Sequence, residues 1–389
     1  MGKDLNMAEK SLVRIVKFLL AFVLIFFILY PVNILSAQEE DCLSNFIYLP
    51  QIQQILRERK IIPGNQKGVY LTGYSMGLVE KREEIYQLIE QSELNSIVFN
   101  AKDDSGFIDY DTDVKLAEEI GAEKKYYDLD EILAEMDERG IYSIARVVVF
   151  KDSVLPKARP DLAIKNAWSG KPLYTEGTYW PDIYCEQVWD YNIEIVKELA
   201  EHGVDEIQFD YIRSPAKKDS AGIEYTYNTD GNTKTWAILG FLEKVRDETE
   251  QYNIKISADV FGWIFIADND QGIGQKLEEI APYLDYIYPM TYPSHYSPYF
   301  LGYEQPAQYP YEVVKYTLNK GMLRIKDSEC IVIPWIQAFS LKVKYSEKDV
   351  LSQISAAEQL GIEGFLFWNA VNKYGMVERA LEIRRNQNL

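Results

Sequence analysis

Histidine and cysteine are both scarce in this chain. Its 389 residues include two histidines, His202 and His295, and three cysteines, none of them in a C-x-x-C pair. These shortages exclude histidine-rich metal sites, most catalytic triads, and the usual zinc and redox motifs. Proton chemistry must therefore fall mainly to carboxylates, and we expect no cofactor and no bound metal.

Basic residues are few relative to acidic ones. The chain has 41 lysines and arginines against 60 aspartates and glutamates, which gives a net charge of −19. A field of this sign repels phosphate backbones, so nucleic acid is not an expected partner. The same field makes neutral glycans easier to bind than anionic cell-wall polymers.

A basic and then apolar segment opens the chain. Basic residues precede an apolar run from Phe18 to Tyr30, and small residues follow it before Gln38. This layout is typical of a signal peptide, although the run is nearly long enough for an uncleaved membrane anchor. We expect residues 1–37 to be one or the other and residues 38–66 to be a linker. Both alternatives place the rest of the chain outside the cytoplasm, secreted or membrane-anchored.

Strand-like apolar runs alternate with amphipathic helical stretches from Gly68 onward. The predicted strands are Val69–Thr72, Ser96–Asn100, Tyr142–Phe150, Glu206–Asp210, Lys255–Val260, Tyr286–Met290, Ile331–Trp335 and Gly364–Trp368. Eight such units predict one closed (β/α)₈ TIM barrel over residues 67–389. No G-x-G-x-x-G motif follows the first strand, so no dinucleotide site is indicated.

Carboxylates end two neighbouring strands of this barrel, and catalytic groups of barrels lie at such ends. Asp210 ends the fourth strand and Asp259 lies on the fifth, which together supply the two carboxylates that glycoside hydrolysis needs. A nearby guanidinium, Arg213 or Arg146, would hold Asp210 ionised as a nucleophile. The apolar residues after Asp259, including Trp263, would keep a proton on it for general acid catalysis. The reverse assignment is also compatible with the sequence.

Other strand-end residues are candidates for substrate binding. They are Asp104, Arg146, Arg213, Tyr292, His295, Trp335, Gln337, Trp368 and Asn369. The Asp103–Gly106 segment is most simply a turn, with a third acid or a calcium ligand as alternatives for Asp104. The aromatic residues either stack on sugars or pack the upper barrel layer. The long segment from Lys151 to Asp182 is expected to serve function.

Six motifs in order carry a family resemblance. They are Lys67–Thr72, Ala101–Gly106, Ile144–Phe150, Glu206–Arg213, Ala258–Gly262 and Pro289–Tyr296. Together they resemble the bacterial "putative glycosyl hydrolase" family, formerly a domain of unknown function, from about Gly68 to Asn369. The resemblance implies a barrel distantly similar to the α-amylase group, with Asp210 at the nucleophile position. The fifth-strand acid of that group is usually Glu, whereas this chain has Asp259.

The expected function is therefore hydrolysis of O-glycosidic bonds in an extracellular polysaccharide or oligosaccharide. The alternative is a catalytically silent glycan-binding barrel at the cell envelope. A chitinase-like mechanism is disfavoured, because Ile212 stands where the fourth-strand motif of chitinases ends in Glu. The membrane is a further partner only if the N-terminal segment stays uncleaved.

Overall fold

The computed structural model describes residues 63–216 and 222–387, which contain the barrel. Eight parallel strands form its wall. In order around the wall they are β1 (Lys67–Leu71), β2 (Ser96–Lys102), β5 (Tyr142–Val148), β9 (Glu206–Asp210), β11 (Lys255–Phe261), β12 (Tyr286–Met290), β14 (Trp335–Gln337) and β15 (Phe365–Trp368). Because β15 also pairs with β1, the sheet closes on itself, and the predicted TIM barrel is confirmed.

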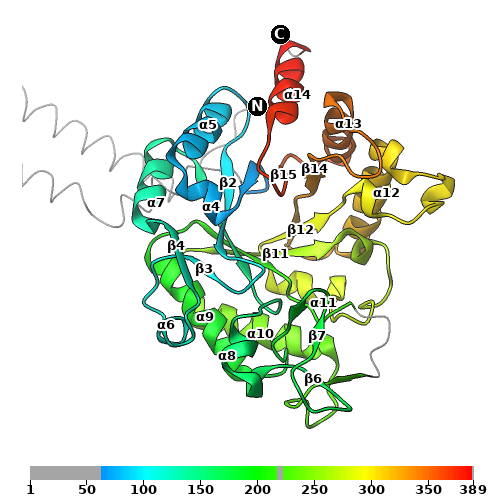
Figure 1. The fold of residues 1–389 in the computed structure, drawn as a ribbon. Coiled ribbons are helices and arrows are strands. Elements are labelled where there is room, and N and C mark those ends of the chain that lie inside the picture. Colours follow the sequence, from blue (N-terminus) through cyan, green and yellow to red (C-terminus); the bar gives the residue numbers. More distant parts are fainter. Residues whose placement is uncertain (1–62, 217–221, 388–389) are drawn as a thin grey trace, which may run out of the picture. The chain divides into compact units, whose positions relative to one another are not determined.

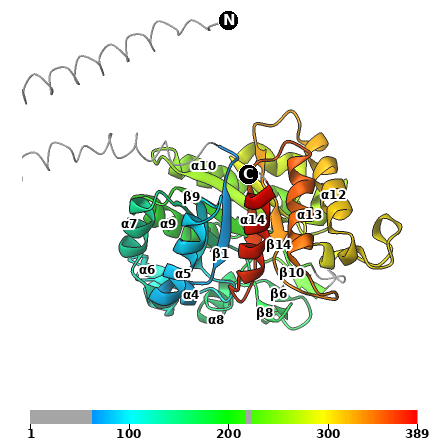
Figure 2. The same ribbon diagram turned by 90° about the horizontal axis from the view of Figure 1, so that it is seen from above.

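Helices surround the strands (Figure 1). They are α4 (Gly73–Gly77), α5 (Val79–Glu90), α6 (Lys115–Ile120), α7 (Leu129–Glu138), α8 (Leu155–Ala158), α9 (Glu186–Glu201), α10 (Lys234–Thr249), α11 (Leu277–Ile280), α12 (Pro310–Arg324), α13 (Glu347–Glu358) and α14 (Gly375–Gln387). Figure 2 shows α12, α13 and α14 side by side, in agreement with their contacts. Single 3₁₀ turns cover Pro160–Leu162, Gly262–Phe265, Ala281–Tyr283, Pro293–His295, Phe300–Gly302 and Pro306–Gln308.

The alternation of side chains along the strands divides the apolar core in two. Val69 and Leu71 of β1 point outward into the layer between strands and helices, whereas Tyr70 points into the barrel. Helix α9 covers its strand with the apolar stripe that its sequence predicts, which includes the buried Trp189 and Ile193. The barrel interior therefore has its own core, on which the cavity residues rest.

The seventh predicted strand is interrupted. Instead of one strand over Ile331–Trp335, the structure has β13 (Ile331–Val332) and then β14, and both pair with β12. Pro334 lies at the break, where its missing N–H group cannot donate to the neighbouring strand. The interruption leaves the barrel closed.

Two strands that the sequence analysis did not predict extend the sheet beyond the barrel. β3 (Ile108–Tyr110) pairs antiparallel with the end of β2, and β4 (Glu123–Tyr127) pairs parallel with β3. The long segment after β5 contains β6 (Lys165–Asn166), β7 (Tyr174–Thr175) and β8 (Thr178–Tyr179). β6 pairs with β10 (Ile223–Glu224), and β7 pairs with β8. Both additions lie after the carboxyl ends of barrel strands.

The predicted signal or anchor segment, residues 1–37, lies outside the described residues, as does all of the predicted linker except 63–66. Over 63–216 and 222–387, no helix combines the length and the apolar character needed to cross a membrane. Both N-terminal assignments therefore stay predictions.

Candidate active site

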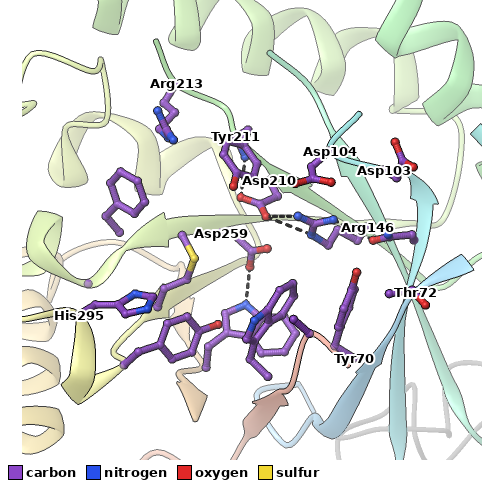
Figure 3. Close-up of a pocket in the computed structure, with 18 of the residues that line it drawn as sticks. Tyr70, Thr72, Asp103, Asp104, Arg146, Asp210, Tyr211, Arg213, Asp259 and His295 are labelled. Carbon is purple, nitrogen blue, oxygen red and sulfur yellow. Dashed lines mark hydrogen bonds and ion pairs between the residues drawn. The ribbon is translucent and has the colours of Figure 1, made fainter. Parts of the chain in front are cut away.

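A cavity of about 1120 Å³ opens at the carboxyl ends of the barrel strands. Nine of the eleven residues predicted from the sequence line it, among them Asp210 and Asp259, and Figure 3 shows several of them. The other seven are Asp104, Arg146, Arg213, Tyr292, His295, Trp335 and Trp368. Most of the candidates, which were chosen because they lie at strand ends, therefore line one cavity.

Asp210 forms a buried ion pair with Arg146. The Nε and Nη2 atoms of Arg146 donate to Asp210 Oδ2 at 3.0 and 2.5 Å, and both side chains are more than nine-tenths buried. The backbone N–H of Tyr211 donates to Asp210 Oδ1 at 2.6 Å. Tyr211 adopts a left-handed conformation with φ of 52°, a strain that is often found at functional sites. Three hydrogen bonds thus fix the position of the Asp210 carboxyl group.

Arg213 does not supply this pairing. It donates to the backbone oxygen of Ser214 at 3.0 Å and to Glu176 at 3.2 Å. Its guanidinium also packs against the rings of Trp180, Tyr211 and Phe261. Of the two guanidiniums considered from sequence, Arg146 is the one that the structure pairs with Asp210.

Asp259 lies beside Asp210 on the neighbouring strand (Figure 3). The β9–β11 register pairs Phe209 with Ala258, so the two aspartates are the next residues along this pairing. Burial, and then repulsion from Asp210, raise the pKa of Asp259 well above its ordinary value. The indole N–H of Trp335 donates to Asp259 Oδ1 at 2.6 Å, which opposes part of this rise. The direction of this shift favours the protonated form of Asp259, whereas Asp210 is paired with a cation.

Asp104 lies at the cavity edge, paired with Lys151 at 2.7 Å. Burial alone would raise its pKa, but the hydrogen bond and charge of Lys151 outweigh burial and hold the pKa below its ordinary value. The preceding Asp103 accepts from the backbone N–H groups of Ser105 and Phe107, which confirms the predicted turn. Over the described ranges, no group of three or more His, Cys, Asp or Glu is arranged to hold a metal ion.

Aromatic rings form the floor on the side of β14, β15 and β1. Trp368 stacks on Tyr70 with ring centroids 4.1 Å apart and meets Trp335 edge-on at 5.5 Å. Arg146 lies over both rings of the stacked pair, at 5.7 Å from Tyr70 and 5.6 Å from Trp368. These rings orient the guanidinium that pairs with Asp210.

Tyr292 and His295 follow β12 and also line the cavity. Their rings meet edge-on with centroids 5.2 Å apart. Burial, and then the charge of Lys342, lower the pKa of His295. His295 is therefore a neutral hydrogen-bonding group at pH 7, not a cation.

Gln337 and Asn369 are the two predicted residues that do not line the cavity. Gln337 is fully buried and donates to the backbone oxygen of Phe339 while accepting from the N–H of Ser294. Asn369 donates to the backbone oxygen of Ala338. Their amides hold the loops above β14 and β15, because buried backbone groups must be paired.

Several cavity residues were not named as site residues from the sequence. Among them are Tyr70, Tyr74, Asp109, Tyr126 and Trp263. The strand-end rule applied to the first strand would have found Tyr74, which follows it by three positions. Asp109 and Tyr126 lie on β3 and β4, whose existence the sequence pattern did not indicate.

Comparison with protein families adds a further observation. Residues 68–374 match the family model described as "Putative glycosyl hydrolase domain". The chain belongs to this family. The resemblance inferred from the six motifs is thereby confirmed, and the family description places this glycosyl hydrolase domain among the enzymes that cleave glycosidic bonds.

Solved structures share the fold of this glycosyl hydrolase domain. The glycoside hydrolase domain of PgaB (BpsB) from Bordetella bronchiseptica has 12% identity and a TM-score of 0.56, covering 81% of this chain and 97% of its own. The GH20 exo-β-N-acetylglucosaminidase from Vibrio harveyi has 12% identity and a TM-score of 0.51, with coverages of 82% and 54%. A hypothetical protein from Ruminiclostridium thermocellum is 37% identical over 49% of this chain and 97% of its own, with a TM-score of 0.46. A comparison with curated proteins found no match.

Proposed function

We propose that this domain hydrolyses O-glycosidic bonds of a neutral extracellular polysaccharide, with Asp210 as the nucleophile and Asp259 as the general acid. One observation carries the proposal: a carboxylate held by a guanidinium lies in one cavity beside a fully buried carboxyl group whose pKa is raised. Two carboxyl groups in different protonation states are what glycoside hydrolysis requires.

The reaction proceeds in two displacements. Asp259 gives its proton to the oxygen that leaves, while Asp210 forms a bond to the anomeric carbon as the glycosidic bond breaks. Water then attacks this carbon, passes a proton back to Asp259 and releases the Asp210 carboxylate. The indole N–H of Trp335 stabilises the Asp259 anion between the two steps. Adjacent strands lie about 4.8 Å apart, which favours the short carboxyl separation of retaining enzymes.

The rims of the cavity suit a polymer. Tyr74 follows the first barrel strand and is 60% exposed, and Trp263 follows the fifth strand and is 44% exposed. In a closed eight-stranded barrel, the first and fifth strands lie across from each other. A glycan that spans the cavity can therefore stack a sugar on an aromatic ring at each side of the carboxyl pair.

The charge of the lining supports an uncharged substrate. Five aspartates, residues 103, 104, 109, 210 and 259, line the cavity together with the cations Arg146, Arg213 and Lys342. With protons on Asp109 and Asp259, the three remaining aspartates balance the three cations, so the lining offers no net positive charge to attract a carboxylated or sulfated polymer.

The test is product release by the full chain from a panel of neutral and amino-sugar polysaccharides. Asp210→Asn should lower kcat by at least about 10³-fold with the fold intact, because the amide cannot form the glycosyl ester. Glu206→Gln is the matched control, since Glu206 lies inward on the same strand but does not line the cavity. Binding of glycans without release by the unaltered chain would favour the silent binding barrel instead.

We also propose that the domain acts outside the cytoplasm, because a basic and then apolar segment opens the chain. Fractionation of expressing cells and N-terminal sequencing test this. A mature chain that begins at Gln38 means cleavage, an intact chain in the membrane fraction means anchoring, and a cytosolic chain contradicts the proposal.

A further inference from the structure

Asp109 is a buried acid of the cavity that the proposed mechanism does not use. It lies on β3, lines the cavity, and is 1% exposed. The backbone N–H of Gly73 hydrogen-bonds its carboxyl group. Its Oδ1 atom has no hydrogen-bond partner within the described part of the chain. A buried oxygen without a partner is costly unless a ligand completes its bonding.

The position of this carboxyl group is fixed by close packing. A Cβ atom on Gly73 would lie 2.2 Å from Asp109 Oδ2, so no other residue fits at position 73 without displacing the acid. Gly73 itself follows β1 at the start of α4, next to the exposed ring of Tyr74. The first and second barrel strands thus hold Asp109 and an aromatic rim together.

Charged and titratable groups from each neighbouring element act on Asp109. They are Asp103 on its own loop, Arg146 on β5, Lys124 and Tyr127 on β4, and Tyr70 on β1. Burial, and then repulsion from Asp103, raise the pKa of Asp109 to about 8, which outweighs the opposite effect of Arg146 and Lys124. At neutral pH the group is mainly a carboxylic acid, with one O–H donor.

Asp109 is separated from the catalytic pair by Arg146. Barrel strand β5, which carries Arg146, lies between β2 with its β3 extension and β9. Arg146 acts electrostatically on both Asp109 and Asp259. A sugar that contacts Asp109 is therefore displaced from the reacting bond toward the rim at Tyr74 and Tyr126.

We propose that Asp109 is a sugar-recognition residue, which donates a hydrogen bond from its neutral carboxyl group to an uncharged oxygen of the sugar that stacks on Tyr74. This rests on the proposed function, because it assigns the cavity to a glycan. The acceptor is a hydroxyl or an acetamido carbonyl oxygen. A sugar carboxylate would meet the acids at positions 103 and 104, and a sugar amine would meet a donor where it needs an acceptor.

The experiment measures glycan binding instead of hydrolysis, so its result does not depend on the chain being catalytically active. The full-length Asp210→Asn chain is titrated calorimetrically with hexasaccharides of glucose, mannose and N-acetylglucosamine at pH 6 and pH 9. We expect about tenfold weaker binding at pH 9, where most of the Asp109 proton is lost. Adding Asp109→Asn should keep binding at pH 6 within about threefold and abolish the change with pH, because an amide also donates at every pH.

Asp109→Ala in the same background should bind about tenfold more weakly at pH 6. If this variant does not fold, the isosteric Asp109→Asn chain alone decides, through its pH profile. Unchanged binding by a folded Asp109→Ala chain would overturn the proposal. So would a pH dependence that survives in Asp109→Asn, tighter binding at pH 9, or the absence of binding to all three hexasaccharides.

Discussion

The two ends of strand β9 carry inward-facing acids with different partners. Glu206 at the closed end is fully buried, accepts from the hydroxyl of Ser257 at 2.5 Å and lies close to the hydroxyls of Tyr142 and Tyr288. Burial raises its pKa to about 8. Asp210 at the open end is nearly as buried but is paired with Arg146. Two acids of similar burial on one strand therefore have different surroundings, hydroxyl groups at Glu206 and a guanidinium at Asp210.

The acid at the closed end of β9 bears on the stability of the barrel, whereas the acid at the open end lines the cavity. The neutral acid at the closed end belongs to a network of hydroxyl groups inside the barrel, where a charge would be costly. The acid at the open end is paired with a buried cation, which is costly to desolvate, and both groups line the cavity. Substitutions can therefore alter one end of β9 while leaving the other unchanged.

Removal of the cation should have the largest effect. In Arg146→Met the Asp210 carboxylate is left buried and unpaired, so the free energy of unfolding should fall by about 3–5 kcal/mol. Hydrolysis should fall by at least about 100-fold, because the guanidinium that positions Asp210 is lost. Urea denaturation and steady-state kinetics measure the two effects.

The double variant Arg146→Met with Asp210→Asn is the matched control. It has no uncompensated charge, so it should recover most of the lost stability while remaining inactive. A stable and active Arg146→Met chain would contradict the role given to the ion pair.

Alteration of the closed end should change the pH dependence of stability and leave activity unchanged. Between its ordinary pKa of 4.5 and the raised value of about 8, Glu206 holds a proton in the folded chain that the unfolded chain releases. Its stabilising contribution is therefore full below pH 4.5 and is lost as the pH rises to 8. Glu206→Gln should remove a slope of up to about 1.4 kcal/mol per pH unit, measured by denaturation at several pH values. An unaltered slope would show that Glu206 is ionised in the folded chain.

Loss of the indole donor should shift the activity profile. The N–H of Trp335 favours the ionised form of Asp259, so Trp335→Phe should raise the pKa of Asp259 further. The alkaline limb of the pH–rate profile should move upward by about one pH unit, since the general acid keeps its proton longer. A shift to lower pH would contradict the assignment of Asp259 as the acid.

A change at the rim, away from both ends of β9, should have the smallest effect. Trp263→Ala should raise KM for a polysaccharide by about tenfold, because a stacking surface is lost. The kcat value and the KM of a disaccharide substrate should not change. An equal loss with both substrates would place Trp263 next to the cleaved bond.

The sequence was sufficient to predict the barrel and its carboxyl pair. All eight strands are apolar runs separated by amphipathic helices, and helix ends at Gly140, Gly203 and Gly361 adopt the expected positive φ. Because parallel strands end at one face, Asp210 and Asp259 had to meet once the strands were assigned in order. Arg146, within the third strand, was a candidate from the same list of polar residues.

Other features of the site depend on contacts between residues far apart in the sequence, so no local sequence pattern predicts them. Asp109 lies on a three-residue strand that exists only because β2 and β4 pair with it. Gln337 and Asn369 occupy strand ends as Asp210 does, yet backbone groups of nearby loops take up their amides. Whether a strand-end side chain faces the cavity depends on these loops, which a strand pattern does not describe.

The β3–β4 extension has a consequence for how such a domain can diversify. Segment 103–127 branches from the end of β2, while β2 keeps its pairings with β1 and β5 and the wall stays closed. Asp109 and Tyr126 belong to this segment, whereas Asp210 and Asp259 belong to the wall. An exchange of segment 103–127 would therefore alter the residue proposed to recognise the sugar and leave the proposed catalytic pair in place.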